Sequence, residues 1–273
     1  MLLQHKNAIV YGAGGSLGGT VAKALAAAGA RVFLTGRNLS SLQRIADEII
    51  ASGGSAEVAI VDAMDERAVN AHIAGVAQRA GSVDISFNAI HLQDVQNIPL
   101  VNMAMADFVR PVNIAVQTNF LTAIAAGRLM MKQQSGVILT LTATPAVTAY
   151  PLTGGFGIAC AAIENFSRLL ATELGPYGVR VVNVRSAGSP DSKFFIDALT
   201  SNPEVVAPIL RKMEEDTMLK KLPPMADIAN TMVFLASNMA GSITGCNIDA
   251  TCGTTAGLNY KMAVVPAGHD IPD

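Results

Sequence analysis

The sequence has few cysteines and few charges. Its three cysteines, at positions 160, 246 and 252, have neither the paired spacing of a disulfide framework nor that of a zinc site. They favour a reducing, cytoplasmic setting. Charged residues make up 15% of the chain and the formal net charge is −2, so the basic surface that nucleic acids require is missing. Hydrophobic residues make up 51%, which excludes a mainly disordered chain.

Neither a signal peptide, a membrane span nor a metal site is expected. The first six residues lead directly into an apolar run, without the regions of a signal peptide. The long uncharged stretch from Gln133 to Ile163 is interrupted by prolines and glycines, which predicts buried strand, loop and helix rather than a span. The histidines are scattered without metal-ligand spacing. A mean hydropathy of +0.39 indicates surface hidden within an oligomer.

Short apolar runs alternate with longer helical patterns along the chain. Strands are predicted over 7–11, 31–35, 56–61, 83–88, 136–142, 180–184 and 247–249, and helices over 16–29, 40–52, 65–80, 104–133, 155–174 and 225–238. This alternation predicts an α/β fold, a single Rossmann-type, doubly wound parallel sheet with helices on both faces. One domain is expected over 1–256. Its less regular segment from about 189 to 224 would form a lid, and 257–273 would be a C-terminal tail.

A glycine-rich loop joins the first predicted strand to the first predicted helix. The residues expected to contact a cofactor there are Gly12, Gly14, Gly15, Ser16, Leu17 and Gly18. Such glycines let the backbone turn tightly and approach a pyrophosphate, whose charge lies at the helix N-terminus. The spacing between Gly12 and Gly18 is wider than in G-x-G-x-x-G. A plain tight turn between strand and helix is the alternative interpretation.

Polar residues after the next two strands are candidates for contacts with the adenosine half of a cofactor, and one of them favours NADP(H) over NAD(H). Arg37 lies about 20 residues past the glycines, where an arginine pairs with a 2′-phosphate. Asp62, followed by Ala63, ends the third strand and could accept a hydrogen bond from the adenine amino group. The alternatives are a solvated arginine for Arg37 and a cap of the helix over 65–80 for Asp62.

In order and spacing, these pieces resemble the short-chain dehydrogenase/reductase family over about residues 5–255. Three motifs carry the resemblance: the opening T-G-x-x-x-G-x-G corresponds to Tyr11–Gly18, N-A-G to Asn88-Ala89-Ile90, and N-x-x-x-P-G to Asn183–Gly188. Ser192 stands where the family often has a threonine that contacts the cofactor. The resemblance implies that Asn88, Ala89, Gly188 and Ser192 bind the cofactor.

The resemblance also implies a catalytic tetrad of Asn, Ser, Tyr and Lys, from which this sequence departs. In the family the tyrosine transfers a proton, the lysine lowers its pKa and holds the ribose, and the serine orients the carbonyl. The serine, tyrosine and lysine positions hold Ala143, Phe156 and Cys160, and the asparagine position falls near Ala115 or Val116. Because Phe156 has no acidic proton, the family's usual acid–base step is not available.

Other polar residues are candidates for the missing groups. Thr142 and Thr144 could hydrogen-bond a carbonyl, and Tyr150 could supply a phenol. His91, just past the N-A-G position, could bring a titratable group to a substrate. The alternative for each is a packing or surface role.

Two functions follow from these observations. The first is an NADP(H)-dependent oxidoreductase that acts on a small carbonyl or enone with a non-canonical active site. The alternative is a catalytically inactive or non-redox member of the family, such as a cofactor sensor, a partner subunit, a lyase or an isomerase. The small residues in the helices over 104–133 and 155–174, together with the resemblance, imply a homodimer or homotetramer. No nucleic-acid or membrane partner is expected.

Overall fold

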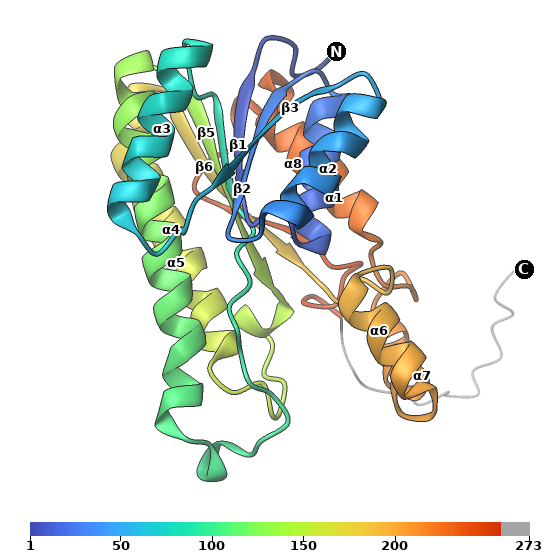
Figure 1. The fold of residues 1–273 in the computed structure, drawn as a ribbon. Helices are drawn as coiled ribbons and strands as arrows, with labels where there is room; N and C mark the ends of the chain where they lie inside the picture. Colours follow the sequence, from blue (N-terminus) through green and yellow to red (C-terminus); the bar gives the residue numbers. More distant parts are fainter. Residues whose placement is uncertain (258–273) are drawn as a thin grey trace, which may run out of the picture.

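Seven parallel strands form the central sheet of the computed structural model, which describes residues 1–257 (Figure 1). The strands are β1 (Asn7–Tyr11), β2 (Arg31–Gly36), β3 (Ser55–Ile60), β4 (Ile85–Asn88), β5 (Gly136–Ala143), β6 (Val179–Ser186) and β7 (Asn247–Ala250). Their order in the sheet is β3-β2-β1-β4-β5-β6-β7, and every pairing is parallel. The order reverses between β1 and β4, which places a crevice at the carboxyl ends of these two strands.

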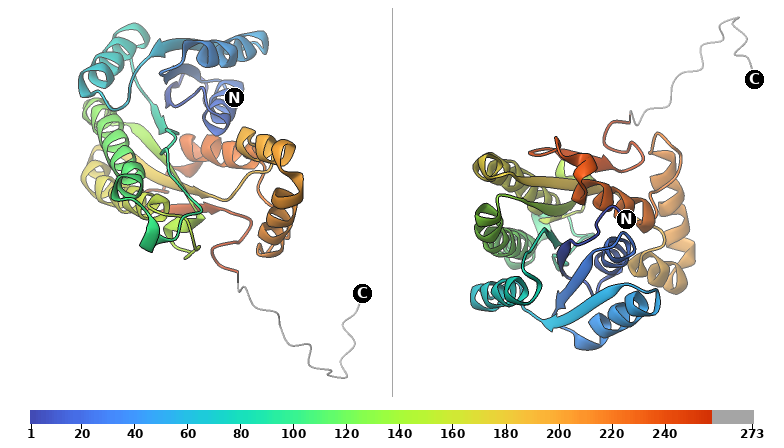
Figure 2. Two further views of the ribbon diagram at one scale, coloured as in Figure 1. Left: turned by 60° about the horizontal axis from the view of Figure 1, so that its bottom comes forward. Right: turned by 90° about the horizontal axis from the view of Figure 1, so that it is seen from above.

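Helices cover both faces of the sheet (Figure 2). One face packs against α1 (Ser16–Ala27), α2 (Leu39–Ala51) and α8 (Met225–Ala236), and the other against α3 (Glu66–Ala80), α4 (Met105–Gln133) and α5 (Phe156–Leu174). Each layer holds its own hydrophobic core. Since both faces are covered, β1 and β4 are buried along their whole length. The predicted fold class is therefore confirmed.

The helix that follows β3 begins with a side-chain cap at Asp65. Its carboxylate accepts hydrogen bonds from the backbone N–H groups of Arg67 and Ala68, which satisfies two of the free donors of the first turn. The alternative role of Asp62 as this cap is therefore wrong. The Asp62 carboxylate instead accepts a hydrogen bond from the backbone N–H of Met64 at 3.0 Å.

The segment from about 189 to 224 is more regular than the sequence suggests. It contains α6 (Lys193–Ser201) and α7 (Pro203–Glu215), which lie beside the carboxyl end of the sheet in Figure 1. Pro203 begins α7, where its missing N–H costs nothing. The segment is tied to the glycine-rich loop, because the backbone N–H of Lys193 donates to Ser16 Oγ at 3.2 Å.

Four 3₁₀ turns complete the described elements: η1 (Leu100–Asn102), η2 (Thr144–Ala146), η3 (Gly175–Tyr177) and η4 (Asn238–Ala240). Apart from Gly257, the predicted tail over 257–273 lies outside the described residues. None of the described helices has the length and apolarity needed to cross a membrane.

Candidate functional site

Two adjoining cavities lie at the carboxyl ends of β1 and β4. The Arg37 cavity, of about 520 Å³, is lined by Arg37, Asp62 and their neighbours. The Phe156 cavity, of about 810 Å³, is lined by Phe156 and Cys160 among others. The two share Gly15, Ala89, Ile90 and His91. A ligand can therefore run from one cavity to the other past the glycine-rich loop, as an extended dinucleotide would require.

A larger cavity, of about 1130 Å³, lies at the amino end of the sheet. Its charged side chains are already paired: Lys6 with Asp84 at 3.2 Å, and Lys23 with Glu48 at 2.8 Å. None of the residues that the sequence predicts for cofactor or substrate lines it. The carboxyl-end cavities are therefore the candidate site.

The glycine-rich loop approaches the end of β4 too closely for a side chain. Gly12 has a φ of +76°, and a Cβ there would lie 2.6 Å from the backbone oxygen of Ala89. A Cβ on Gly18 would collide with the backbone oxygen of Gly12. The first helix begins at Ser16 with no side-chain cap from Gly15. Its first-turn N–H groups are thus available to an anion. The glycine-rich loop and this helix start together form a cradle that fits the pyrophosphate of a nicotinamide dinucleotide.

Polar groups at the far end of the Arg37 cavity are partly free to bind a ligand. Arg37 is exposed, and within residues 1–257 its guanidinium makes no hydrogen bond or ion pair. The neighbouring Asn38 is not free in the same way, because its side chain caps α2 by accepting from the backbone N–H of Ser41 at 3.1 Å. A cation without a partner at this position fits a ligand that carries a phosphate.

The wall of the Phe156 cavity is built from the end of β5 and the start of α5. Ala143, Phe156 and Cys160 all line the cavity, as do Asn88 on β4 and Asn119 on α4. Cys160 is only 1% exposed, and burial raises the pKa of its thiol to about 12. At neutral pH this side chain is therefore an uncharged thiol, without the fixed charge of an ammonium group.

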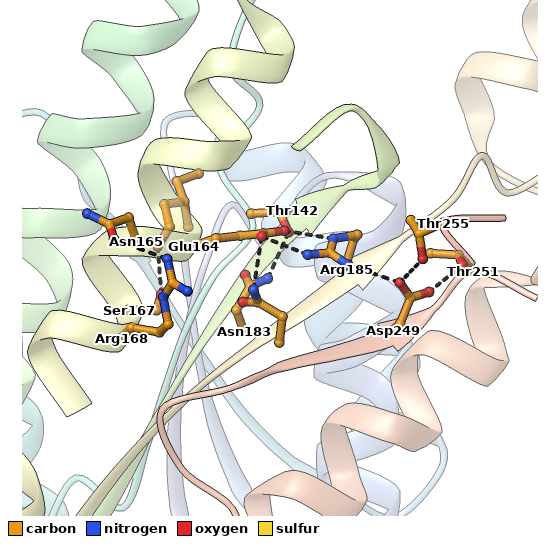
Figure 3. A network of polar contacts seen from close by, with 12 residues as sticks. Thr142, Glu164, Asn165, Ser167, Arg168, Asn183, Arg185, Asp249, Thr251 and Thr255 are labelled. Atoms are coloured by element: carbon orange, nitrogen blue, oxygen red, sulfur yellow. Dashed lines mark hydrogen bonds and ion pairs between the residues drawn. The ribbon is translucent and has the colours of Figure 1, made fainter. Parts of the chain in front are cut away.

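Behind this wall lies a buried polar network (Figure 3). The Thr142 hydroxyl donates to Glu164 Oε1 at 2.9 Å and accepts from Asn183 Nδ2 at 2.7 Å. Arg185 binds the same carboxylate at two points, from Nε to Oε1 at 2.8 Å and from Nη2 to Oε2 at 2.7 Å. The hydroxyl of Thr142 is therefore held within the protein, although the residue lines the cavity.

The network continues from Arg185 to the last strand. Arg185 Nη1 contacts Asp249 Oδ2 at 3.0 Å, and the hydroxyls of Thr251 and Thr255 donate to the same carboxylate. The hydrogen bonds and charge of Glu164, with those of Asp249, raise the pKa of Arg185 despite its burial. The network thus joins α5 to β5, β6 and β7 beneath the cavity.

Most residues predicted to contact the cofactor lie around the two cavities. Those that line one or both are Gly12, Gly14, Gly15, Ser16, Leu17, Gly18, Arg37, Asp62, Ala63, Asn88, Ala89 and Ser192. Gly188 lines neither, and a Cβ there would instead lie 3.0 Å from the ring of Phe195 and 2.8 Å from Met213 Cε. Thr144 and Tyr150 also line neither cavity.

Several polar residues of the Phe156 cavity are absent from the sequence-based candidates, among them Asn119 and Asp94. Asn119 is only 4% exposed, and its Nδ2 donates to the backbone oxygen of Ala115 at 2.9 Å. Its Oδ1 has no partner within residues 1–257. The period of the α-helix could have indicated that Asn119 faces the site, because it lies one turn after Ala115, near which the family's asparagine position falls. Asp94 lies in the loop between β4 and α4. Because a loop has no regular period, the sequence does not indicate that this side chain lies at the cavity.

The family model described as enoyl-(acyl carrier protein) reductase matches residues 12–255. An uncharacterized oxidoreductase of Mycobacterium tuberculosis is 31% identical over 255 residues, which cover 93% of each chain. The 7alpha-hydroxysteroid dehydrogenase of Escherichia coli K12 is 30% identical over 258 residues, which cover 94% of this chain and 97% of that one. These matches extend over nearly the whole described chain.

Solved structures share the fold. NAD⁺-bound xylitol dehydrogenase has a TM-score of 0.84 at 24% identity, covering 93% of this chain and 100% of that one. A short-chain type dehydrogenase/reductase from Mycobacterium ulcerans has a TM-score of 0.86 at 24% identity, covering 94% and 92%. By the family match and the two relatives, the chain belongs to the short-chain dehydrogenase/reductase family of oxidoreductases.

Proposed function

We propose that this protein is an NADP(H)-dependent oxidoreductase that acts on a small carbonyl compound or enone. The observation that carries the proposal is the pair of cavities joined at the glycine-rich loop. The Arg37 cavity would hold the adenosine half of a dinucleotide, and the Phe156 cavity would hold its nicotinamide and a substrate. When bound, the nicotinamide supplies the hydride chemistry, while the protein binds and orients both reactants.

The preference for NADP(H) rests on Arg37. Its exposed guanidinium lines the Arg37 cavity with Asp62 and Ser41, so it can pair with a 2′-phosphate without first breaking an ion pair. Asp62 is then left for the adenosine of the same nucleotide.

Calorimetric titration with NADPH and NADH tests this preference. A hydrogen bond to a charged group is worth about 1.5–3 kcal/mol. Arg37→Ser should therefore weaken NADPH binding by roughly 10- to 100-fold and leave NADH binding unchanged. Arg67→Ser is the matched control, because Arg67 is also exposed but lines neither cavity. Equal affinity for the two nucleotides in the unmodified protein would contradict the preference.

The substrate proposed for the Phe156 cavity is uncharged. Among the residues that the structure describes, the lining of this cavity contains the carboxylate of Asp94 and no lysine or arginine. A substrate carboxylate or phosphate would therefore find no cation among them. Much of the remaining lining is apolar, with Leu92, Leu141 and Phe194 among it. The relative named as a hydroxysteroid dehydrogenase supports an alcohol or ketone of this kind.

We also propose that the active site is non-canonical. Ala143, Phe156 and Cys160 would stand at the serine, tyrosine and lysine positions of the family. The support is that all three line the Phe156 cavity together. None of them offers a hydroxyl or an ammonium group to the reacting oxygen.

A second copy of this chain is the proposed partner, in a homodimer or homotetramer. Val116 and Phe120 on α4, with Ile158 and Leu169 on α5, are each at least half exposed, and an interface would bury them. Light scattering on the eluting protein tests this, and a monomer at micromolar concentration would contradict it. We further propose a cytoplasmic location, since all three cysteines are free thiols.

A further inference from the structure

Among residues 1–257, the ionisable side chains that line the Phe156 cavity are His91, Asp94 and Cys160. We propose that His91 is the group that transfers the proton to and from the substrate oxygen, so that proton transfer has moved from α5 to the loop after β4. This proposal rests on the proposed function, because it assigns a residue to the reaction proposed for the same cavity.

The hydroxyl groups around the cavity are poorly placed for this role. Thr142 is held between Glu164 and Asn183. The Ser186 hydroxyl donates to the backbone oxygen of Thr142 at 3.2 Å. Aliphatic hydroxyls in any case do not give up a proton near neutral pH without a partnering base. Thr144 and Tyr150 do not line the cavity.

The two other ionisable groups are also unsuited to donate a proton. Cys160 is buried, and burial raises the pKa of its thiol to about 12. Asp94 is a carboxylate whose Oδ2 already accepts a hydrogen bond from Gln96 Nε2 at 2.6 Å.

His91 has the position and the orientation that proton transfer needs. It lines both cavities, and so lies where they meet. Its Nδ1 accepts from the backbone N–H of Gln93 at 3.0 Å, which orients the ring; in this neutral form the ring proton lies on Nε2. The side chain is exposed, so it can exchange that proton with water. The charged or titratable groups around it are Asp94 and Cys160 in one cavity and Arg37 and Asp62 in the other.

The proposed step balances in atoms and electrons. For reduction, the carbonyl carbon receives a hydride from reduced nicotinamide, the pair of electrons of the carbon–oxygen π bond moves to oxygen, and that oxygen takes a proton from the protonated imidazole of His91. Donation from Nε2 leaves a neutral ring with its proton on Nδ1, and Nε2 then regains a proton from water. For oxidation, Nε2 of this Nδ1-protonated ring accepts the hydroxyl proton as the hydride leaves carbon. Both steps require the hydrogen bond from Gln93 to open, because Nδ1 then carries a proton.

The test compares His91→Gln with the unmodified full-length protein. The glutamine amide can hydrogen-bond but cannot transfer a proton near neutral pH. NADPH affinity, measured by calorimetry, should stay unchanged, while the single-turnover reduction of an uncharged ketone such as 2-decalone, or of the compound reduced fastest in a panel of ketones and enones, should slow by about 10²- to 10⁴-fold. His5→Gln is the matched control, because His5 is exposed and lines the cavity at the amino end of the sheet.

Two readouts separate proton transfer from a structural role. The reduction rate of the unmodified protein should fall with rising pH, with the same midpoint as the chemical shift of the His91 Cε1–H followed by NMR. Added imidazole should restore activity to His91→Gly. Full activity of His91→Gln, or different midpoints, would overturn the assignment to His91 and leave the proposed function intact. NADPH binding with no ketone or enone reduced would overturn both.

Discussion

Arg185 and Glu164 form a buried, two-point ion pair directly behind the Phe156 cavity. Arg185 Nη2 lies 2.7 Å from Glu164 Oε2, and the two residues are 9% and 5% exposed. Asn247 Nδ2 donates to the same oxygen at 2.9 Å. The pair therefore fixes the middle of α5 relative to β6, behind the wall of the cavity.

Removing Glu164 from this ion pair should lower the stability of the protein, because the buried charge of Arg185 is then left with a single counter-charge, that of Asp249. Glu164→Gln is expected to lower the free energy of unfolding by about 3 kcal/mol in urea denaturation. Glu173→Gln on the same helix is exposed and should change little. The double variant Glu164→Gln/Arg185→Gln should recover part of the loss. A single variant as stable as Glu173→Gln would contradict this account of the network.

The cradle can be tested with a pair of glycines that share a backbone conformation. Gly12 and Gly53 have φ values of +76° and +81°, but a Cβ on Gly53 would meet nothing within 4 Å. Gly53→Ala should cost roughly 1–2 kcal/mol of stability through the strained φ. Gly12→Ala should cost more, because its Cβ would also collide with the backbone oxygen of Ala89. Gly12→Ala alone should abolish nucleotide binding in calorimetry. Normal NADPH binding by Gly12→Ala would show that the loop does not hold the pyrophosphate.

Tyr11, at the end of β1, buries a hydroxyl that has no partner within residues 1–257. Burial raises the pKa of this phenol, so it stays neutral. Because an unpaired buried hydroxyl carries a desolvation cost, Tyr11→Phe should raise the free energy of unfolding by about 1 kcal/mol. Thermal and urea unfolding measure the change. A loss of stability would reveal a hydrogen-bond partner for Tyr11.

Stability should fall in weak acid because of His72 on α3. Burial, with the nearby charge of Arg79, lowers the pKa of His72 from 6.5 to about 4. Between these two values the unfolded chain binds a proton that the folded chain does not, so lowering the pH favours unfolding, by up to about 3 kcal/mol. Urea midpoints at about pH 7 and about pH 4.5 should differ less in His72→Gln than in the unmodified protein. An equal difference would mean that other groups cause the acid sensitivity.

The sequence predicts the sheet well because strands buried on both faces leave a strong apolar pattern. The run from Asn7 to Tyr11 is predicted to the residue. The cap of α3 is harder, because Asp62 and Asp65 both precede the helix and only backbone geometry shows that Asp65 accepts the N–H groups.

The walls of the substrate cavity are harder to predict from the sequence than the sheet is. Its walls come from loops and from contacts between distant segments, such as the hydrogen bond from the backbone N–H of Asn97 to the backbone oxygen of Leu152 at 2.8 Å. That contact joins the loop carrying Asp94 to the loop before α5. Likewise, the role of Thr142 in the network depends on Glu164 and Asn183, which lie 22 and 41 residues away in the sequence.

Hydride transfer itself is the central claim, and isotope labelling tests it most directly. The protein would be incubated with NADPH deuterated at the transferred position of C4 and with an uncharged ketone, and the product would be analysed by mass spectrometry. The account predicts an alcohol with one deuterium on the former carbonyl carbon. An absence of deuterium from every product of a ketone and enone panel, although NADPH binds, would contradict it.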